Sequence, residues 1–389
     1  MNRMKRNRIQ LYLIRLLAGG LLAGCTAGPV EEIVPEESRP VAISFGKPDL
    51  GVPELLTRAG EEVTPLPTLL PEGATVRIGA YFTGYVGDKP QEASFSTTAP
   101  SFEATYAVGA DGTLIPCCVD GNGKKIDGEA KGLTVRGGVY DFYAVSPARP
   151  LQEGDDGYYK ITGLPHKEDV MTSFVRGVAV TKDSRLVTLG TFSRKCAQVV
   201  FNVAPSPDNA LPFEKLYGTD LVIKKISSSA AGLIAGSDTG ISPTGGASGV
   251  EAQVVFSAEE FEEVEPESDP DGCGLNKTKG VVLPKNSLPF DVEITVVRDN
   301  ETATLKATID KNISFDEGKR YIFTLEVKNN ESSLLMKVLE WNAIAFRDDN
   351  VGGPDSPYPD PDINEGIGTT ITVATWKVIN WNDMNVGGG

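Results

Sequence analysis

Apolar and polar residues alternate along most of the chain after residue 75, and this pattern sets the expected fold. Val76, Ile78 and Ala80 form one apolar face, with Arg77 and Gly79 between them. A period of two residues is typical of a β-strand that buries one of its faces. The runs with this pattern lie at residues 76–82, 139–145, 199–203 and 320–327.

Turn residues separate these runs and predict hairpins, because Asp-Gly and Asn-Gly pairs adopt positive φ angles at little cost. Such pairs occur at residues 111–112, 120–121, 122–123 and 127–128. Residues 290–297 and 302–309 read as an antiparallel hairpin joined through residues 298–301. No segment keeps helical periodicity over three turns, so residues 212–217 and 258–264 could form short helices at most.

Length and composition indicate how these strands are divided into domains. The chain has 389 residues, of which 42 are glycine and 26 are proline. This length exceeds one ordinary domain core and favours two. We predict an all-β fold of two tandem β-sandwich domains, with a C-terminal extension strand. The expected domains are residues 59–184 and 185–350, and residues 351–389 hold a linker and the last strand.

The N-terminal segment is built like a secretion signal. Basic residues precede a short apolar body that Arg15 interrupts, and residues 22–25 read Leu-Ala-Gly-Cys, which resembles the bacterial lipobox. The apolar body is too short to span a membrane, which takes about 20 residues. We predict a signal peptide over residues 1–24 followed by a lipidated Cys25, and an ordinary signal peptide with an incidental cysteine is the alternative. Thr26, rather than the aspartate typical of inner-membrane retention, favours the outer membrane.

Charge and reactive residues narrow the class of function. The net charge of −16 opposes binding to nucleic acid, whose phosphates need a basic surface. His166 is the only histidine, so any nucleophile that needs a histidine base must use it, and we interpret it as a loop residue. Cys117, Cys118, Cys196 and Cys273 lack metal-ligand spacing, and we expect at most one disulfide among them. We predict no catalytic residue, no metal site and no cofactor, and therefore no enzyme.

The C-terminal residues differ in kind from the rest of the chain. Residues 348–366 are rich in Asp, Pro and Gly and read as a linker, and the strongly β-prone residues 369–380 follow. This strand either folds back onto the second domain or adds to the sheet edge of another molecule. Its apolar residues are Ile371 and Val373 on one face, and Ala374, Trp376 and Val378 on the other.

Six short motifs follow one another in order along the chain. They are the lipobox at residues 22–25, Val-Ala-Ile-Ser-Phe at 41–45, Thr-Arg-Ala at 57–59, Gly-Val-Tyr-Asp-Phe-Tyr-Ala-Val-Ser-Pro at 138–147, Gly-Lys-Arg-Tyr-Ile-Phe-Thr-Leu at 318–325 and Trp-Asn at 341–342. In this order they resemble the fimbrillin family, the lipoprotein-derived subunits of type V pili in Bacteroidales. The order of the motifs, rather than any one of them, carries the resemblance.

The resemblance implies that the two β-sandwich domains are transthyretin-like, and it also implies a maturation scheme. An arginine-specific protease would cut after Arg58, leave Ala59 as the new N-terminus, and remove a lipidated propeptide, residues 25–58, together with the strand at residues 41–45. The emptied groove would accept residues 369–380 of a neighbouring subunit. The implied partners are other pilus subunits, the protease and, through the lipid of the precursor, the outer membrane. The implied location is the outer membrane and then the cell-surface fimbrium.

A second function is compatible with the same sequence. A surface lipoprotein that stays anchored would bind a glycan or a host protein, and Trp376, Trp381 and Tyr358 could stack on sugar rings. Polymerisation separates the two functions. A pilin cut at Arg58 forms polymers, whereas a glycan-binding lipoprotein stays monomeric and binds sugar uncut.

Overall fold

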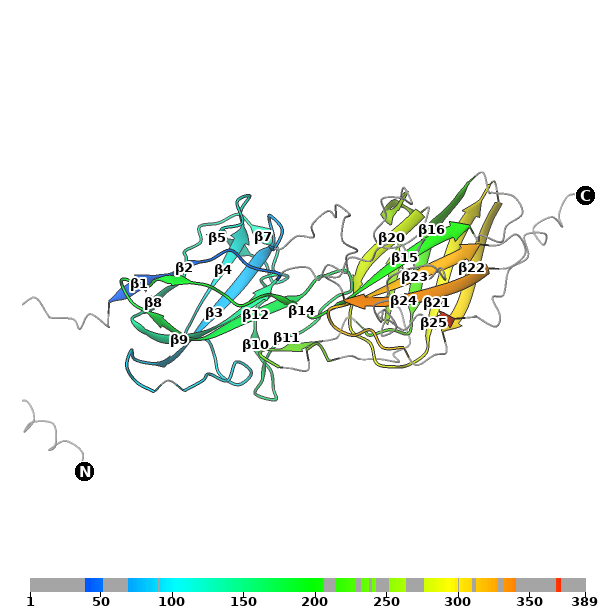
Figure 1. The fold of residues 1–389 in the computed structure, drawn as a ribbon. Coiled ribbons are helices and arrows are strands. Elements are labelled where there is room, and N and C mark those ends of the chain that lie inside the picture. Colours follow the sequence, from blue (N-terminus) through cyan, green and yellow to red (C-terminus); the bar gives the residue numbers. More distant parts are fainter. Residues whose placement is uncertain are drawn as a thin grey trace, which may run out of the picture.

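The computed structural model is made of β-strands arranged in two lobes that lie end to end (Figure 1). The prediction of an all-β fold of sandwich domains is confirmed, and no α-helix occurs among the described residues. The structure describes residues 39–51, 69–89, 91–205, 215–228, 232–237, 240–242, 252–263, 276–299, 301–309, 313–327, 332–340 and 369–371.

The first lobe is built on a six-stranded antiparallel sheet. Its strands are β3 (Thr75–Gly84), β4 (Phe102–Val108), β5 (Leu114–Pro116), β9 (Gly138–Ser146), β12 (Met171–Val180) and β14 (Ser193–Arg194). Their order across the sheet is β14-β12-β9-β3-β4-β5. Three short pairs accompany this sheet: β1 (Pro40–Ala42) with β8 (Thr134–Arg136), β2 (Ser44–Phe45) with β13 (Leu186–Val187), and β6 (Cys118–Val119) with β7 (Lys125–Ile126).

The central strand β9 is buried on both faces, whereas the alternation predicts burial of one face. All nine of its residues are buried. Phe142 belongs to the core of the first lobe, and Tyr143, on the opposite face, belongs to a second apolar cluster. Asp141, only 1% exposed, accepts hydrogen bonds from the Gly177 N–H (2.8 Å) and from Arg176 Nη1 (2.8 Å). The charge is therefore tolerated inside the lobe because it is paired and hydrogen-bonded.

The second lobe packs a six-stranded sheet against a four-stranded one. The first contains β19 (Phe261–Glu263), β20 (Asn276–Val282), β15 (Ala197–Pro205), β23 (Lys319–Val327), β24 (Ser332–Glu340) and β25 (Thr369–Ile371), in that order. The second contains β18 (Gln253–Phe256), β16 (Leu216–Lys224), β21 (Phe290–Arg298) and β22 (Glu301–Ile309), in that order. The predicted hairpin is confirmed, since β21 and β22 pair antiparallel from Phe290↔Ile309 to Arg298↔Glu301.

A short helix considered from the sequence is not formed where the structure describes it. Leu216 and Tyr217 begin β16, whose register on β21 starts at Leu216↔Arg298. Pairing with a long partner strand outweighs the local preference of a few residues. The other candidate divides into a 3-10 turn, Ala258–Glu260, and the strand β19.

The pairing of two short strands bears on where the two domains divide. We expected the division after residue 184, but β13 pairs with β2 and β14 pairs with β12, both in the first lobe. Strands of two residues carry no alternation, so the pattern could not reveal them. We propose that the two domains meet between Arg194 and Ala197.

A third apolar cluster joins the lobes. Strand β17 (Leu233–Ile234) pairs antiparallel with β11 (Tyr159–Ile161), and β10 (Gln152–Glu153) completes this three-stranded sheet. Phe95 and Tyr143 of the first lobe share the cluster with Leu233 and Leu283. The lobes are therefore joined by a packed core as well as by the chain itself.

His166 lies in this junction, in the loop that the sequence predicts. Its Nδ1 accepts the N–H of Leu283 (3.1 Å), and its Nε2 lies 2.8 Å from the carbonyl oxygen of Ser227. A backbone N–H can only donate and a carbonyl can only accept, so the ring is neutral and carries its proton on Nε2. Both ring nitrogens of His166 therefore form hydrogen bonds that link the two lobes.

Acidification is expected to weaken this junction. Burial lowers the pKa of His166, so the unfolded chain, with a histidine pKa of about 6.5, binds the proton first. The stability that His166 contributes is present above about pH 6.5 and is lost as the pH falls through the folded-state pKa. Melting temperatures measured from about pH 7.5 to about pH 5 should fall more steeply for the wild type than for His166→Asn. Equal slopes would contradict this role, because all other titrating groups are common to both proteins.

Candidate functional site

The segment of residues 39–51 threads through the first lobe between two strand edges. β1 runs antiparallel to β8, and β2 runs parallel to β13. The backbone N–H of Ile43, between these ladders, donates to the carbonyl of residue 133 (2.9 Å), and those of Ser44 and Gly46 donate to the carbonyls of residues 185 and 187 (3.0 and 2.9 Å). The space between β8 and β13 that this segment fills is called the groove from here on.

Side chains of the segment are part of the first lobe's core. Val41, Ile43 and Leu50 are 8%, 7% and 4% exposed. Phe45 packs edge-to-face on Tyr106 and Phe142, with ring centroids 5.4 and 5.9 Å apart. Alternation at residues 41, 43 and 45 places these side chains on one face of an extended chain, which explains why this short sequence forms the strand.

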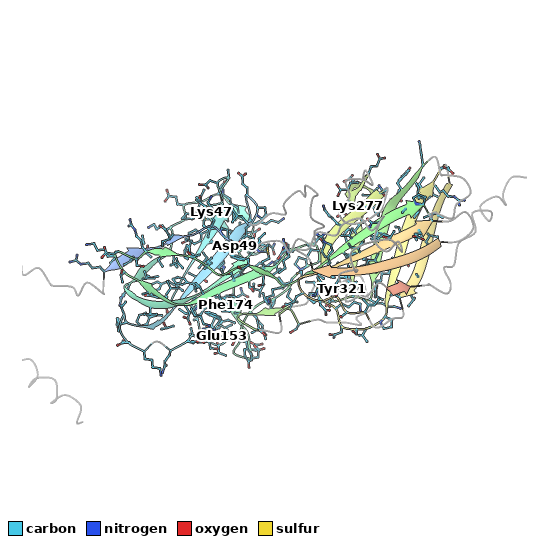
Figure 2. All side chains as sticks on the ribbon, in the orientation of Figure 1. Lys47, Asp49, Glu153, Phe174, Lys277 and Tyr321 are labelled. Atoms are coloured by element: carbon cyan, nitrogen blue, oxygen red, sulfur yellow. The ribbon has the colours of Figure 1, made fainter. Side chains whose placement is uncertain are left out.

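Polar contacts fix the end of the segment. The carbonyl of Asp49 accepts the N–H of Phe192 (2.7 Å), and its carboxylate accepts the Gly51 N–H (2.9 Å) and the Thr191 hydroxyl (3.3 Å). Asp49 and Lys47 are labelled on the first lobe in Figure 2. The segment is thus tied to its lobe at both ends and along its length.

Two tyrosine hydroxyls form hydrogen bonds with the backbone of the groove wall. The N–H of Leu133 donates to the Tyr106 hydroxyl (2.7 Å), and the Tyr140 hydroxyl donates to the Arg136 carbonyl (2.9 Å). Burial raises the pKa of the Tyr106 hydroxyl, so this group stays neutral at physiological pH. These two hydrogen bonds tie the wall beside β8 to strands β4 and β9 of the six-stranded sheet.

The residues chosen from the sequence as processing and exchange sites lie mostly outside the described part of the chain. These are Cys25, Arg58, Ala59, Val373, Ala374, Trp376 and Val378. Ile371 is described, as the last residue of β25. β25 pairs antiparallel with β24, with Thr369 opposite Met336 and Ile371 opposite Leu334. These three C-terminal residues thus fold back on the edge of the second lobe.

Reactive side chains in the described residues are held in structural contacts. Cys117, Cys118 and Cys196 are free thiols, and burial raises the pKa of Cys196 to about 12. No three His, Cys, Asp or Glu residues in the described ranges are grouped as a metal site would require.

No helix in the part of the chain that the structure describes is long and apolar enough to cross a membrane.

The walls of the groove are the residues of the candidate site that sequence reasoning missed. Leu133, Val135 and Val187 are buried beside the segment, but they lie in or beside strands of two or three residues. The alternation Thr-Val-Arg at residues 134–136 is too short to distinguish a strand from a loop. The strand at residues 41–45 could be expected from its motif, whereas the strands β8 and β13 that pair with it could not.

Solved structures and family comparisons place this fold among known proteins. A crystal structure of a proposed cell adhesion protein from Bacteroides fragilis has a TM-score of 0.50 and 17% identity, covering 77% of this chain and 98% of that chain. At this identity the likeness shows a shared fold. A second such protein, from Bacteroides uniformis, has a TM-score of 0.44 and 16% identity, covering 78% of this chain and 99% of that chain.

The tip fimbrial protein Mfa3 from Porphyromonas gingivalis, with a C-terminal truncation, has a TM-score of 0.37 and 8% identity, covering 69% of this chain and 95% of that chain. No curated protein matches the chain. The sequence model of the fimbrillin-like family matches residues 123–341, which is more than half of the chain. This match begins after the groove segment and ends at the first residue of the Trp-Asn motif. The chain therefore belongs to the fimbrillin-like family.

Proposed function

We propose that this protein is a structural and adhesive subunit of a surface pilus. In this proposal it is exported as a lipoprotein on Cys25, matured by cleavage after Arg58, and polymerised by strand exchange with other pilus subunits. It acts at the outer membrane and then in the fimbrium on the cell surface, and it carries no enzymatic activity. Membership of the fimbrillin-like family supports a pilus subunit.

One observation carries the proposed mechanism. Residues 39–51 pack in the core of the first lobe, and they precede Arg58 in the sequence. A single cut after Arg58 would separate residues 39–51 from everything that binds them. The strand would then be held only by non-covalent contacts and could be replaced. The donor residues 371 and 373, or 374, 376 and 378, repeat the apolar alternation of residues 41, 43 and 45.

Blocking the cut is expected to block assembly. Arg58→Ala should leave uncut precursor and no polymers, because the groove stays filled. N-terminal sequencing of surface material should give Ala59 for the wild type. Arg39→Ala is the matched control and should mature normally, since a cut after Arg39 would leave residues 40–51 in the groove and is not the maturing cut. A mature N-terminus that still includes Ile43, or a protein that binds sugar while remaining monomeric and uncut, would contradict the proposal.

A further inference from the structure

Exposed apolar side chains gather at the end of the first lobe that faces away from the second lobe. Phe82, Tyr85 and Val86 are 41%, 53% and 50% exposed. These three residues are called the tip patch. In Figure 1, β1, β8 and the loop that leaves β3 lie together at this end. Single exposed apolar residues are ordinary, but a group of adjacent ones marks an interaction surface.

The tip patch is continuous with the entrance of the groove. The ring of Phe82 lies 5.2 Å from that of Tyr85 and 5.5 Å from that of Tyr140, between centroids. The Tyr140 hydroxyl bonds the carbonyl of Arg136 (2.9 Å), and Arg136 pairs with Pro40, the first residue of β1. A chain that enters the groove at β1 therefore passes beside the patch.

The turn that presents the patch is ordered by its own hydrogen bonds. The N–H of Tyr85 donates to the Asp88 carboxylate (3.3 Å), and the N–H of Asp88 donates to the Tyr85 carbonyl (3.1 Å). Gly87 takes the positive φ of 101° that the turn requires. Apolar side chains on an ordered turn lose less entropy on binding than side chains on a loose loop.

The direction of residues 39–51 in the groove indicates on which side the donating subunit would lie. A donated strand with the same direction as β1 and β2 reuses the hydrogen bonds that Ile43, Ser44 and Gly46 make in the precursor. In a C-terminal donor the linker at residues 348–366 comes before the strand. The body of the donating subunit therefore lies at the β1 end of the groove, where the tip patch is.

We propose that the tip patch docks the body of the neighbouring subunit, a second copy of this chain, whose strand fills the groove. The inference rests on the proposed strand exchange. A strand on an Asp/Pro/Gly linker binds without fixing how the two bodies sit. A second contact beside the groove raises the effective concentration of the strand and sets a head-to-tail direction.

The test replaces the two most exposed residues of the patch. The double variant Tyr85→Ser/Val86→Ser should keep the wild-type melting temperature, because both side chains face solvent. After cleavage at Arg58 it should form polymers about tenfold less efficiently than the wild type, which corresponds to about 1.4 kcal/mol of lost contact free energy. It should still bind a peptide of residues 369–380, since its groove is unchanged.

A matched control replaces two apolar side chains of similar exposure elsewhere on the same lobe. Ile115 and Ile126 are 54% and 48% exposed, and Ile115→Ser/Ile126→Ser should polymerise like the wild type. Polymerisation of the tip-patch variant at the wild-type rate, or an equal loss in the control, would overturn the docking role. A different result would contradict strand exchange itself: in that case the cut wild-type protein would neither polymerise nor bind the peptide.

Discussion

A chain that begins at Ala59 is expected to lose much of the stability of its first lobe. It lacks Val41, Ile43 and Leu50, all buried in the core of that lobe. Complete burial of such side chains stabilises by roughly 1.5–3 kcal/mol each, so the loss should be on the order of 5 kcal/mol. The carbonyls that accepted hydrogen bonds from the strand are also left without those donors, which adds about 1–3 kcal/mol for each one that water cannot reach.

The deficit should be recovered when a strand is supplied in trans. Thermal unfolding of the chain that begins at Ala59 should move to higher temperature on addition of a peptide of residues 39–51, and also with a peptide of residues 369–380. A peptide of residues 39–51 with Ile43→Asp is the matched control and should give no shift, because it would bury an unpaired charge.

A chain that begins at Pro40 isolates the effect of the groove segment. It keeps β1 and β2 but lacks everything before them, so it should unfold at the temperature of the precursor. If the chains that begin at Pro40 and Ala59 unfold at the same temperature without peptide, the segment does not support the lobe. Strand exchange would then have no driving force, and the proposed mechanism would fail.

Period-two alternation predicted the long strands well because each of them has an apolar face of its own. The hairpin of β21 and β22 is such a case, with Val292 and Ile294 buried and Arg298 close to its turn. The strand at residues 41–45 was expected only from the resemblance of its Val-Ala-Ile-Ser-Phe motif to the fimbrillin family, although its buried residues also alternate. Local pattern was sufficient wherever a strand was long or its partner was adjacent in sequence.

Contacts between distant parts of the chain could not be predicted in this way. The parallel pairing of β15 with β23 joins Gln198 to Arg320, and the junction joins His166 to Leu283 and Ser227. Neither contact leaves a local signal, because the partners are chosen by packing of the whole lobe. Strands β8 and β13, which line the groove, could not be predicted for a simpler reason. They have only three and two residues, which is too short to show a period.

The two described segments that take part in the proposed strand exchange make different contacts. The N-terminal segment contributes three buried aliphatic side chains and an aromatic ring to its lobe. The described C-terminal strand, β25, contributes three backbone pairs at a sheet edge. In the proposed scheme, cleavage would therefore have to release a segment that packs in the core, whereas the described part of the donor lies at a sheet edge.

Deleting residues 367–389 is expected to abolish donation while leaving the fold intact. Only the three residue pairs of β25 on β24 are lost from the described structure, so the melting temperature should change little. After cleavage at Arg58 the deleted protein should form no homopolymer on gels, because no strand is available to fill a neighbour's groove. Its own groove is unchanged, so it should still accept a strand and terminate polymers of the full-length protein when the two are mixed.

The opposite pattern of results would assign the C-terminal strand to its own lobe. In that case the exposed edge of β24 would destabilise the second lobe by several kcal/mol, and polymerisation would be unaffected. A variant that keeps the full length but carries Ile371→Asp and Val373→Asp separates strand chemistry from chain length. If residues 371 and 373 enter the groove, this variant should fail to donate just as the deletion does, because two carboxylates would enter an apolar channel lined by Leu133, Val135 and Val187. Normal polymers from this variant would show that those two side chains do not enter the groove.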